Sequence, residues 1–147
     1  MTKKFTHFDD SGNPNMVDIN DKKDTKRLAV AIGKVVMQKE TLELINKNKI
    51  KKGDVFQVAN IAGIQGAKKT DNLIPLCHSL PLSYVKITFD PDEKNNCVNI
   101  KAEASLIGKT GVEMEALTAV SISALTIYDM CKSVDKTIKI DSVKLIH

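Results

Sequence analysis

The sequence contains no tryptophan, few aromatic residues and a single arginine, Arg27. Arginine supplies the bidentate fork with which proteins read base edges, so its scarcity disfavours sequence-specific DNA binding. All other basic side chains except the histidines are lysines, and the 147-residue chain has a net charge of +4. Lysine suits the phosphate groups of a small molecule, although a charge excess of this size also serves solubility alone.

Cysteines are few, and long hydrophobic runs are missing. Cys77, Cys97 and Cys131 are an odd number without CxxC spacing, which indicates reduced thiols rather than a disulfide framework. The uncharged apolar stretch Ala116–Tyr128 is shorter than the about 20 residues of a membrane-spanning helix. Because no apolar signal core follows the first lysines, we expect a cytoplasmic protein without a membrane partner.

The chain length and composition are typical of one globular domain with its own core. Hydrophobic residues make up 42% of the 147 residues and charged residues 27%. We therefore expect a single domain over residues 1–147. Its residues 1–20 should be irregular, because Gly12 and Pro14 interrupt regular structure there.

Hydrophobic periodicity predicts an alternation of strands and helices. The expected elements are a strand at Thr25–Met37 (or a helix), helices at Lys39–Asn46 and Asp54–Lys69, a loop at Leu73–Leu82, strands at Ser83–Asp90 and Cys97–Leu106 joined by a turn at Pro91–Asn96, a helix at Gly111–Lys132 and a strand at Thr137–Ile146. Asp54 is the expected N-cap of its helix. This order predicts an α+β fold, a ferredoxin-like split βαβ arrangement with an antiparallel sheet and an extra helix.

Two of the predicted helices have unusual compositions. Gly63 and Gly66 lie inside the helix at 54–69, where each costs about 1 kcal/mol relative to alanine, so another backbone should approach closely. The helix at 111–132 is apolar nearly all round, which is typical of a helix buried on both sides. One small sheet covers one side only, so we expect an oligomer whose subunits meet beside this helix.

The start of the long helix is a candidate phosphate site. Thr110 and Glu113 have the spacing of a capping box, and Gly108 and Gly111 allow a ligand to approach the backbone. A helix N-terminus presents free N–H groups and a positive dipole end to phosphate. The alternative is an ordinary helix start with no ligand.

The end of the long helix carries candidate acid–base groups. Asp129 and Lys132 are three residues apart and share a helix face, and Glu115 falls near the same stripe four turns earlier. The apolar surroundings predict a desolvated lysine whose pKa is lowered, so that it exchanges protons near neutral pH. The alternative is an exposed ion pair that contributes little.

Cys77 and His78 lie in the proline-bounded loop. Adjacent residues seldom face each other in an extended chain, which disfavours a Cys–His catalytic pair. Because His7 and His147 are terminal and no other ligand has suitable spacing, we expect no metal site at His78.

Several strings of residues resemble one family. They are Met16–Asp18, the pattern T-x-R-x-A-x-A-x-G at Thr25–Gly33, Lys52–Val55, Ile61–Ile64, Leu73–His78 and the whole of Gly108–Lys132. Together they resemble the cyclic pyranopterin monophosphate synthase family (molybdenum cofactor biosynthesis protein C) from His7 to about Leu145. This chain has Ser79 where the family usually has proline, and Gly66 where it often has alanine.

The resemblance implies a lyase of pterin assembly. The family converts 3′,8-cyclo-7,8-dihydro-GTP to cyclic pyranopterin monophosphate and releases pyrophosphate. It implies a ferredoxin-like homohexamer, a trimer of dimers with active sites at dimer interfaces. No cofactor is required, although Mg²⁺ can accompany the triphosphate. The implied catalytic residues are Lys52, Asp129 and Lys132, and the implied substrate contacts are Leu76, Cys77, His78, Glu113, Met114 and Glu115, with Asp18 a weaker candidate.

These residues fit the implied chemistry, because lysines stabilise departing pyrophosphate and can serve as acid and base in turn. Two other functions remain as alternatives. An RNA-binding sheet would need stacking aromatics, and the predicted strands offer only Tyr84 and Phe89, so we expect no nucleic-acid partner. An oligomer without catalytic activity is the other alternative.

Overall fold

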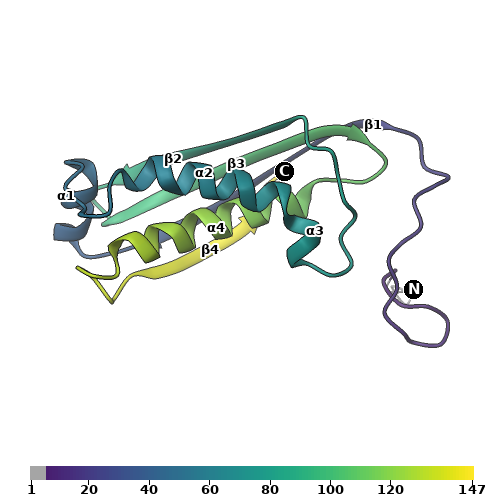
Figure 1. Ribbon diagram of the computed structural model, residues 1–147, viewed down its shortest axis with the longest axis horizontal. Coiled ribbons are helices and arrows are strands. Elements are labelled where there is room, and N and C mark those ends of the chain that lie inside the picture. The colour runs from purple at the N-terminus through teal and green to yellow at the C-terminus, as the bar shows by residue number, and fades with distance from the viewer. Residues whose placement is uncertain (1–5) are drawn as a thin grey trace.

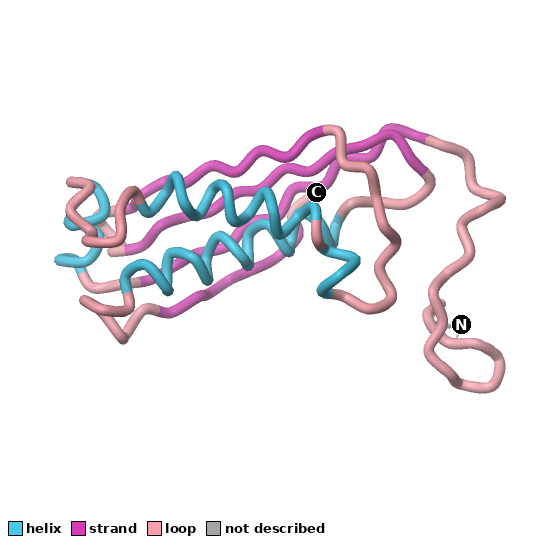
Figure 2. Tube along the Cα trace, in the orientation of Figure 1, coloured by secondary structure: helices cyan, strands magenta, loops and turns pink. Residues whose placement is uncertain are grey.

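The computed structural model describes residues 6–147 and has two layers, with two long helices lying on one face of a sheet (Figure 1). The elements in chain order are β1 (Thr25–Val36), α1 (Lys39–Asn46), α2 (Val55–Lys68), α3 (Thr70–Leu73), β2 (Tyr84–Asp92), β3 (Cys97–Gly108), α4 (Glu113–Cys131) and β4 (Lys139–Leu145). The α2 and α4 helices run side by side along the strands, and α1 lies at one end of the molecule (Figure 2). No helix formed by residues 6–147 covers the other face of the sheet.

The four-stranded sheet has the order β2-β3-β1-β4, and all neighbouring strands are antiparallel. The residues Thr25–Val36 pair along their whole length with β3, which confirms the strand interpretation of this segment against a helix. The element order and the antiparallel sheet confirm the α+β prediction and are compatible with a ferredoxin-like fold.

Most predicted boundaries differ from the observed ones by a few residues. The hairpin strands are longer than predicted, because Pro91 lies within β2 and pairs with Val98. β2 is an edge strand, where a proline without an N–H group is tolerated. The short helix α3 was not predicted. It ends at Leu73, the first residue of the segment that was expected to be a loop.

The α2 helix confirms both predictions made for it. The Asp54 side chain accepts a hydrogen bond from the backbone N–H of Gln57 and so caps the helix. A methyl group at Gly63 would contact Ser123 and Ile87 and would lie 3.0 Å from the backbone oxygen of Ala119 on α4. The missing side chain therefore allows the two helices to pack at close range.

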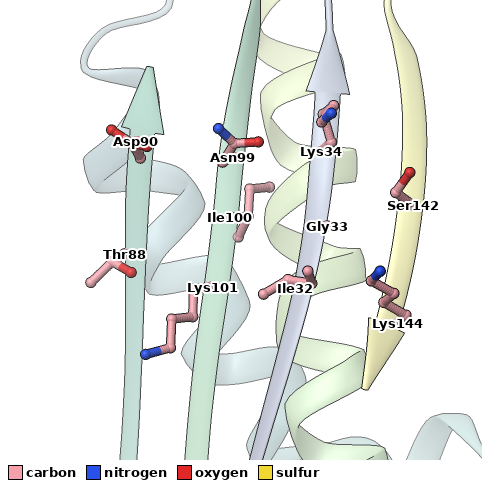
Figure 3. Close-up of a pocket in the computed structure, with 10 residues that line it drawn as sticks. All are labelled: Ile32, Gly33, Lys34, Thr88, Asp90, Asn99, Ile100, Lys101, Ser142 and Lys144. Carbon is pink, nitrogen blue, oxygen red and sulfur yellow. The ribbon is translucent and has the colours of Figure 1, made fainter. Parts of the chain in front are cut away.

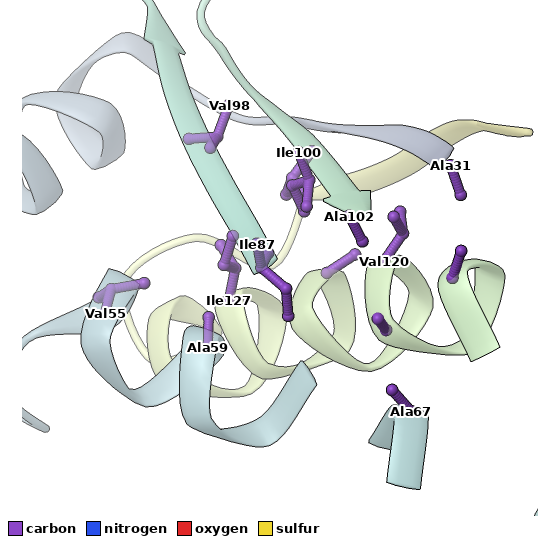
Figure 4. Close-up of a cluster of buried hydrophobic side chains, with 14 of the residues drawn as sticks. Ala31, Val55, Ala59, Ala67, Ile87, Val98, Ile100, Ala102, Val120 and Ile127 are labelled. Carbon is purple, nitrogen blue, oxygen red and sulfur yellow. The ribbon is translucent and has the colours of Figure 1, made fainter. Parts of the chain in front are cut away.

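The core lies between the sheet and the two long helices (Figure 4). Small residues of β1, such as Ala29 and Ala31, face it together with aliphatic residues of β3 and α4 such as Ile100 and Val120. The α2 helix covers a second side of α4, so part of the apolar surface that we expected another subunit to bury is buried within one chain. Leu125 on α4 nevertheless remains 54% exposed.

The predicted capping box at the start of α4 is wrong. The helix begins at Glu113, and its N-cap residue is Val112, which makes no side-chain capping bond. The Glu113 carboxylate folds back over Gly111 and occupies the space that a side chain at that position would need. Thr110 therefore lies outside the helix, and its hydroxyl does not cap it.

Candidate functional site

Two lysine amines meet one carboxylate at the C-terminal end of α4. The Lys132 Nζ lies 2.7 Å from Oδ1 of Asp129, and the Lys52 Nζ lies 3.1 Å from Oδ2. Lys52 also donates a hydrogen bond of 2.8 Å to the backbone oxygen of Asp129. The amine thereby satisfies a carbonyl of the last helical turn, where the helix dipole favours a positive charge. The structure therefore brings the three predicted catalytic residues together, and we call them the Lys–Asp–Lys cluster.

The electrostatics of this cluster differ from our expectation for Lys132. The hydrogen bonds from Lys132 and Lys52 lower the pKa of Asp129. The hydrogen bond to Asp129 raises the pKa of Lys132, whereas we predicted that burial would lower it. The reason is exposure, since the Lys132 side chain is 53% accessible in the single chain and burial is too weak to offset the ion pair. Lys132 is therefore a cation at neutral pH in this form.

A tight turn after α1 presents Lys52 to the cluster. The N–H of Gly53 donates to the carbonyl of Ile50 at 3.0 Å, which closes the turn around Lys52. Gly53 has a φ of 111°, a conformation that residues with side chains rarely adopt. Ile50 is buried and anchors the turn in the core. The backbone thus fixes the position from which the long Lys52 side chain reaches Asp129.

The predicted substrate-contact residues line a cavity of about 730 Å³ at the opposite, N-terminal end of α4. Its floor is formed by the first turn of the helix, and one wall by the loop after α3. The predicted residues found there are Leu76, Cys77, His78, Glu113, Met114 and Glu115. The structure therefore gathers all six into one hollow, which is lined mainly by apolar side chains.

Burial perturbs two acids of the cavity. Glu115 is 4% exposed, and burial, followed by the nearby charges of Glu113 and Asp71, raises the pKa of its carboxyl group. Burial, again followed by the nearby carboxylates, raises the pKa of the Cys77 thiol. Two carboxylates in the first turn of α4 already complement the positive end of the helix dipole. This arrangement disfavours the helix N-terminus as a phosphate site in the single chain.

His78 is held by the chain that precedes β1. Its Nε2 atom lies 2.7 Å from the backbone oxygen of Val17. Because a carbonyl only accepts, Nε2 carries the proton and Nδ1 is the unprotonated nitrogen when the ring is neutral. Asp18, the weaker candidate, is exposed and is absent from the lining of the cavity.

Part of the cavity wall was not predicted from the sequence. His7, Phe8 and Pro14 line it from the segment that we expected to be irregular. Phe8 and Pro14 form an isolated bridge, and Asp9 closes the turn between them by accepting from the N–H groups of Ser11 and Asn13. The turn-forming run from Asp9 to Asn13 was the available signal, but no local pattern showed where the turn packs.

The cluster and the cavity are separated by the length of α4. Glu115 and Asp129 are fourteen residues apart on one helix, which corresponds to about 21 Å at the rise of an α-helix. Glu115 and Asp129 therefore do not share a site within one chain, although they fall near the same stripe of the helix.

A second hollow of about 560 Å³ lies on the helix-free face of the sheet (Figure 3). Lys34, Lys101 and Lys144 line it together with Asp90, and it contains none of the predicted site residues. The same face offers little for base stacking. Phe89 instead packs on the inner side against Phe56, with ring centroids 5.2 Å apart.

Residues 6–147 contain no group of three or more His, Cys, Asp or Glu side chains arranged to hold a metal ion. None of their helices is long and apolar enough to cross a membrane.

Comparison with known proteins decides the family. The sequence profile of the MoaC family matches residues 16–147. The chain therefore belongs to the MoaC family. Relatives named cyclic pyranopterin monophosphate synthase include a protein of Chloroflexus aurantiacus, 58% identical over 97% of this chain and 88% of the relative. A protein of Natranaerobius thermophilus with this name is 51% identical over 99% of this chain and 91% of its own length. Another, from Clostridium perfringens, is 51% identical over 99% and 92%.

Proposed function

We propose that this chain is a cyclic pyranopterin monophosphate synthase, a lyase of molybdenum cofactor biosynthesis. In this reaction 3′,8-cyclo-7,8-dihydro-GTP gives cyclic pyranopterin monophosphate and pyrophosphate. The observation that carries the proposal for the site is the contact of two lysine amines with Asp129, at the positions that the family resemblance selects. Cyclic pyranopterin monophosphate synthase is also the name of the relatives that match nearly the whole chain.

The Lys–Asp–Lys cluster has the charge that a triphosphate requires. Lys132 is protonated at neutral pH because Asp129 stabilises its charge. A fixed pair of cations stabilises the negative charge that develops on departing pyrophosphate. Lys132 can then give its proton to the reacting group and take one back, once the enclosed site lowers its pKa. Asp129 orients both amines in this scheme.

The cavity fits the purine-derived part of the substrate. Its apolar lining suits a flat ring system, and His78 offers a hydrogen-bond acceptor at Nδ1. Glu115 is buried with a raised pKa, so its carboxyl group can exchange a proton closer to neutral pH than an exposed glutamate. The cavity would therefore hold the ring system while the cluster acts on the phosphates.

A cluster and a cavity at opposite ends of one helix require a second copy of the chain to form one site. Glu115 and Asp129 lie symmetrically about Ile122 along α4. A two-fold axis near Ile122 would place the cluster of one copy against the cavity of the other, because an isologous interface pairs opposite ends. The outer side of the helix layer is apolar there, with Val58, Ile61 and Leu125 42%, 58% and 54% exposed. The further assembly of dimers into a hexamer is proposed from the family resemblance.

Turnover of the cyclised dihydro-GTP tests the proposed reaction. Pyrophosphate and the cyclic phosphate should form together in equal amounts. Parallel assays with EDTA and with added Mg²⁺ show whether the triphosphate needs the metal. Lys52→Ala and Lys132→Ala should abolish turnover without dissociating the oligomer, whereas Lys47→Ala, which removes an exposed lysine paired with Glu43, should not. Near-normal turnover by either cluster variant would remove that residue from the mechanism.

Mixing two inactive variants tests the shared site. Lys132→Ala disables the cluster, and His78→Ala disables the cavity. If each site uses one cluster and the partner's cavity, a mixed dimer contains one intact site. An equal mixture after subunit exchange should then recover about a quarter of wild-type turnover. A mixture that stays inactive although mixed dimers are detected by mass spectrometry would show that both halves act within one chain.

A further inference from the structure

Asp135 is a buried carboxylate just beyond α4 that the proposed mechanism does not use. It is 2% exposed and lies three residues after Lys132. Its Oδ1 atom accepts from the N–H of Thr137 at 2.8 Å and from the Thr137 hydroxyl at 2.7 Å. Its Oδ2 atom accepts from the N–H of Gln38 at 2.9 Å and from the Thr41 hydroxyl at 3.1 Å. The two oxygens therefore join two distant segments of the chain.

Each of these segments leads to one lysine of the cluster. The N–H of Asp135 donates to the carbonyl of Cys131 at 3.0 Å, which ties the carboxylate to the last turn of α4 beside Lys132. Gln38 is the N-cap residue of α1, and its own side chain makes no capping bond. Asp135 instead satisfies the backbone N–H of this N-cap residue from outside the helix. It also places a negative charge at the positive end of the α1 dipole.

The α1 helix transmits this anchor to Lys52. Its residues Leu42 and Ile45 are buried in the core. The N–H of Lys49 donates to the carbonyl of Leu44 at 2.8 Å, and the turn that carries Lys52 follows Lys49 directly. The path from Asp135 to Lys52 is thus made of packed and hydrogen-bonded backbone. By contrast, Lys52 contacts Asp129 through its long, flexible side chain.

We propose that Asp135 is a positioning residue that sets the distance between the two lysines of the Lys–Asp–Lys cluster by joining the start of α1 to the end of α4. This inference rests on the proposed function for its catalytic consequence. The structural role of Asp135 does not depend on that function, because it concerns only how α1 and α4 are held together.

The charge of Asp135 is retained in the folded protein. Burial opposes its ionisation, but the hydrogen bonds from Gln38, Thr137 and Thr41 outweigh burial, and the pKa of the carboxyl group is lowered. Hydrogen bonds to a buried charge are stronger than those to a neutral group. An uncharged replacement should therefore loosen the junction without emptying any space in the core.

Asp135→Asn tests this role, because the side chain keeps its size but turns one acceptor into a donor that faces the N–H of Gln38 or Thr137. We expect kcat to fall about tenfold to a hundredfold, the effect of misplacing reacting groups by a fraction of an ångström. KM should change less, since the cavity lies at the other end of α4. Thr41→Val, which removes one bond and keeps the charge, should act in the same direction but more weakly.

Titration of Asp129 separates positioning from general stability. In the wild type the hydrogen bonds from Lys132 and Lys52 lower the pKa of Asp129. Asp135→Asn should withdraw Lys52 and shift this pKa up towards the ordinary value, as measured by NMR of ¹³C-labelled aspartate. Asp141→Asn is the matched control, because it removes the same charge from an exposed position on β4. It should leave kcat and the titration of Asp129 unchanged.

Two results would overturn the proposal. One is a lower melting temperature for Asp135→Asn with kcat and the Asp129 titration unchanged at assay temperatures well below melting. The other is an equal effect of Asp141→Asn. If the wild type itself made no cyclic product, the proposed function would fail, and the Asp129 titration would still decide whether Asp135 positions the cluster.

Discussion

Gly63 is the position where the packing of α2 on α4 makes a prediction that opposes helix propensity. Alanine is favoured over glycine by about 1 kcal/mol in a helix interior, so propensity alone predicts that Gly63→Ala stabilises the protein. The new methyl group, however, would contact the Ser123 hydroxyl and Ile87 and lie 3.0 Å from the backbone oxygen of Ala119. We therefore expect a net loss of stability.

The magnitude follows from what must move. Ser123 is completely buried, and its hydroxyl donates to the carbonyl of Ala59 at 3.0 Å. Displacing it leaves a buried polar pair unsatisfied, which costs about 1–3 kcal/mol. Overpacking against Ile87 and the α4 backbone adds about 1–3 kcal/mol. After subtraction of the propensity gain, we expect the free energy of unfolding to fall by about 1–5 kcal/mol.

Urea unfolding at a fixed protomer concentration measures this change, because stability of an oligomer depends on concentration. Gly66→Ala is a comparison on the same helix. Its methyl group would lie 2.8 Å from Cγ1 and 3.0 Å from Cβ of the half-buried Ile122, so the helices must shift, but no buried hydroxyl is among the nearest atoms. This variant should therefore lower stability less than Gly63→Ala does.

A double variant locates the clash. Ser123→Ala removes the hydroxyl that the new methyl group meets, so Gly63→Ala should cost less in that background than in the wild type. A Gly63→Ala protein as stable as the wild type, or additive costs in the double variant, would refute the close packing of α2 on α4 that the structure shows.

Three further predictions concern titratable groups. Because burial raises the pKa of Glu115, its ionisation opposes folding once the pH rises above the unfolded value near 4.5. Glu115→Gln should therefore raise the melting temperature at pH 7 while turnover falls. An unchanged melting temperature would contradict this. Lys132→Met removes the strongest influence that lowers the pKa of Asp129, which should therefore rise in a ¹³C NMR titration, and a constant value would disprove the ion pair. Burial raises the pKa of the Cys131 thiol to about 11, so iodoacetamide at pH 8 should label Cys77, which is half-buried, well before Cys131, as read by peptide mass spectrometry. Equal labelling of the two in the native protein would count against the burial of Cys131.

Much of the fold could be predicted from local patterns. The alternation of apolar and polar residues predicted the hairpin of β2 and β3, and the glycines at 63 and 66 indicated a close contact between helices. The start of α4 was mispredicted, because a capping box is read from spacing alone. The tertiary position of Gly111 lets the Glu113 carboxylate fold back instead.

The residues of the candidate site could be selected from the sequence, but their positions relative to one another could not. The strings around Lys52, His78 and Asp129 mark the family, and the structure brings together Lys52 and Asp129, which are 77 positions apart in the chain. No local signal showed that the cavity lies at the other end of α4, or that the turn after Phe8 forms part of its wall. Those facts depend on how the loop after α3 and the first residues fold onto the helix.

The amino-acid sequence by itself determined the kinds of element, the family and the types of reactive side chain, because periodicity, turn residues and motif strings are local properties of the chain. Only the tertiary structure decided which of those side chains share a site and how each is charged. Contacts such as Lys132 with Asp129 and the burial of Glu115 depend on distances between packed elements, and the pKa of each group follows from those distances.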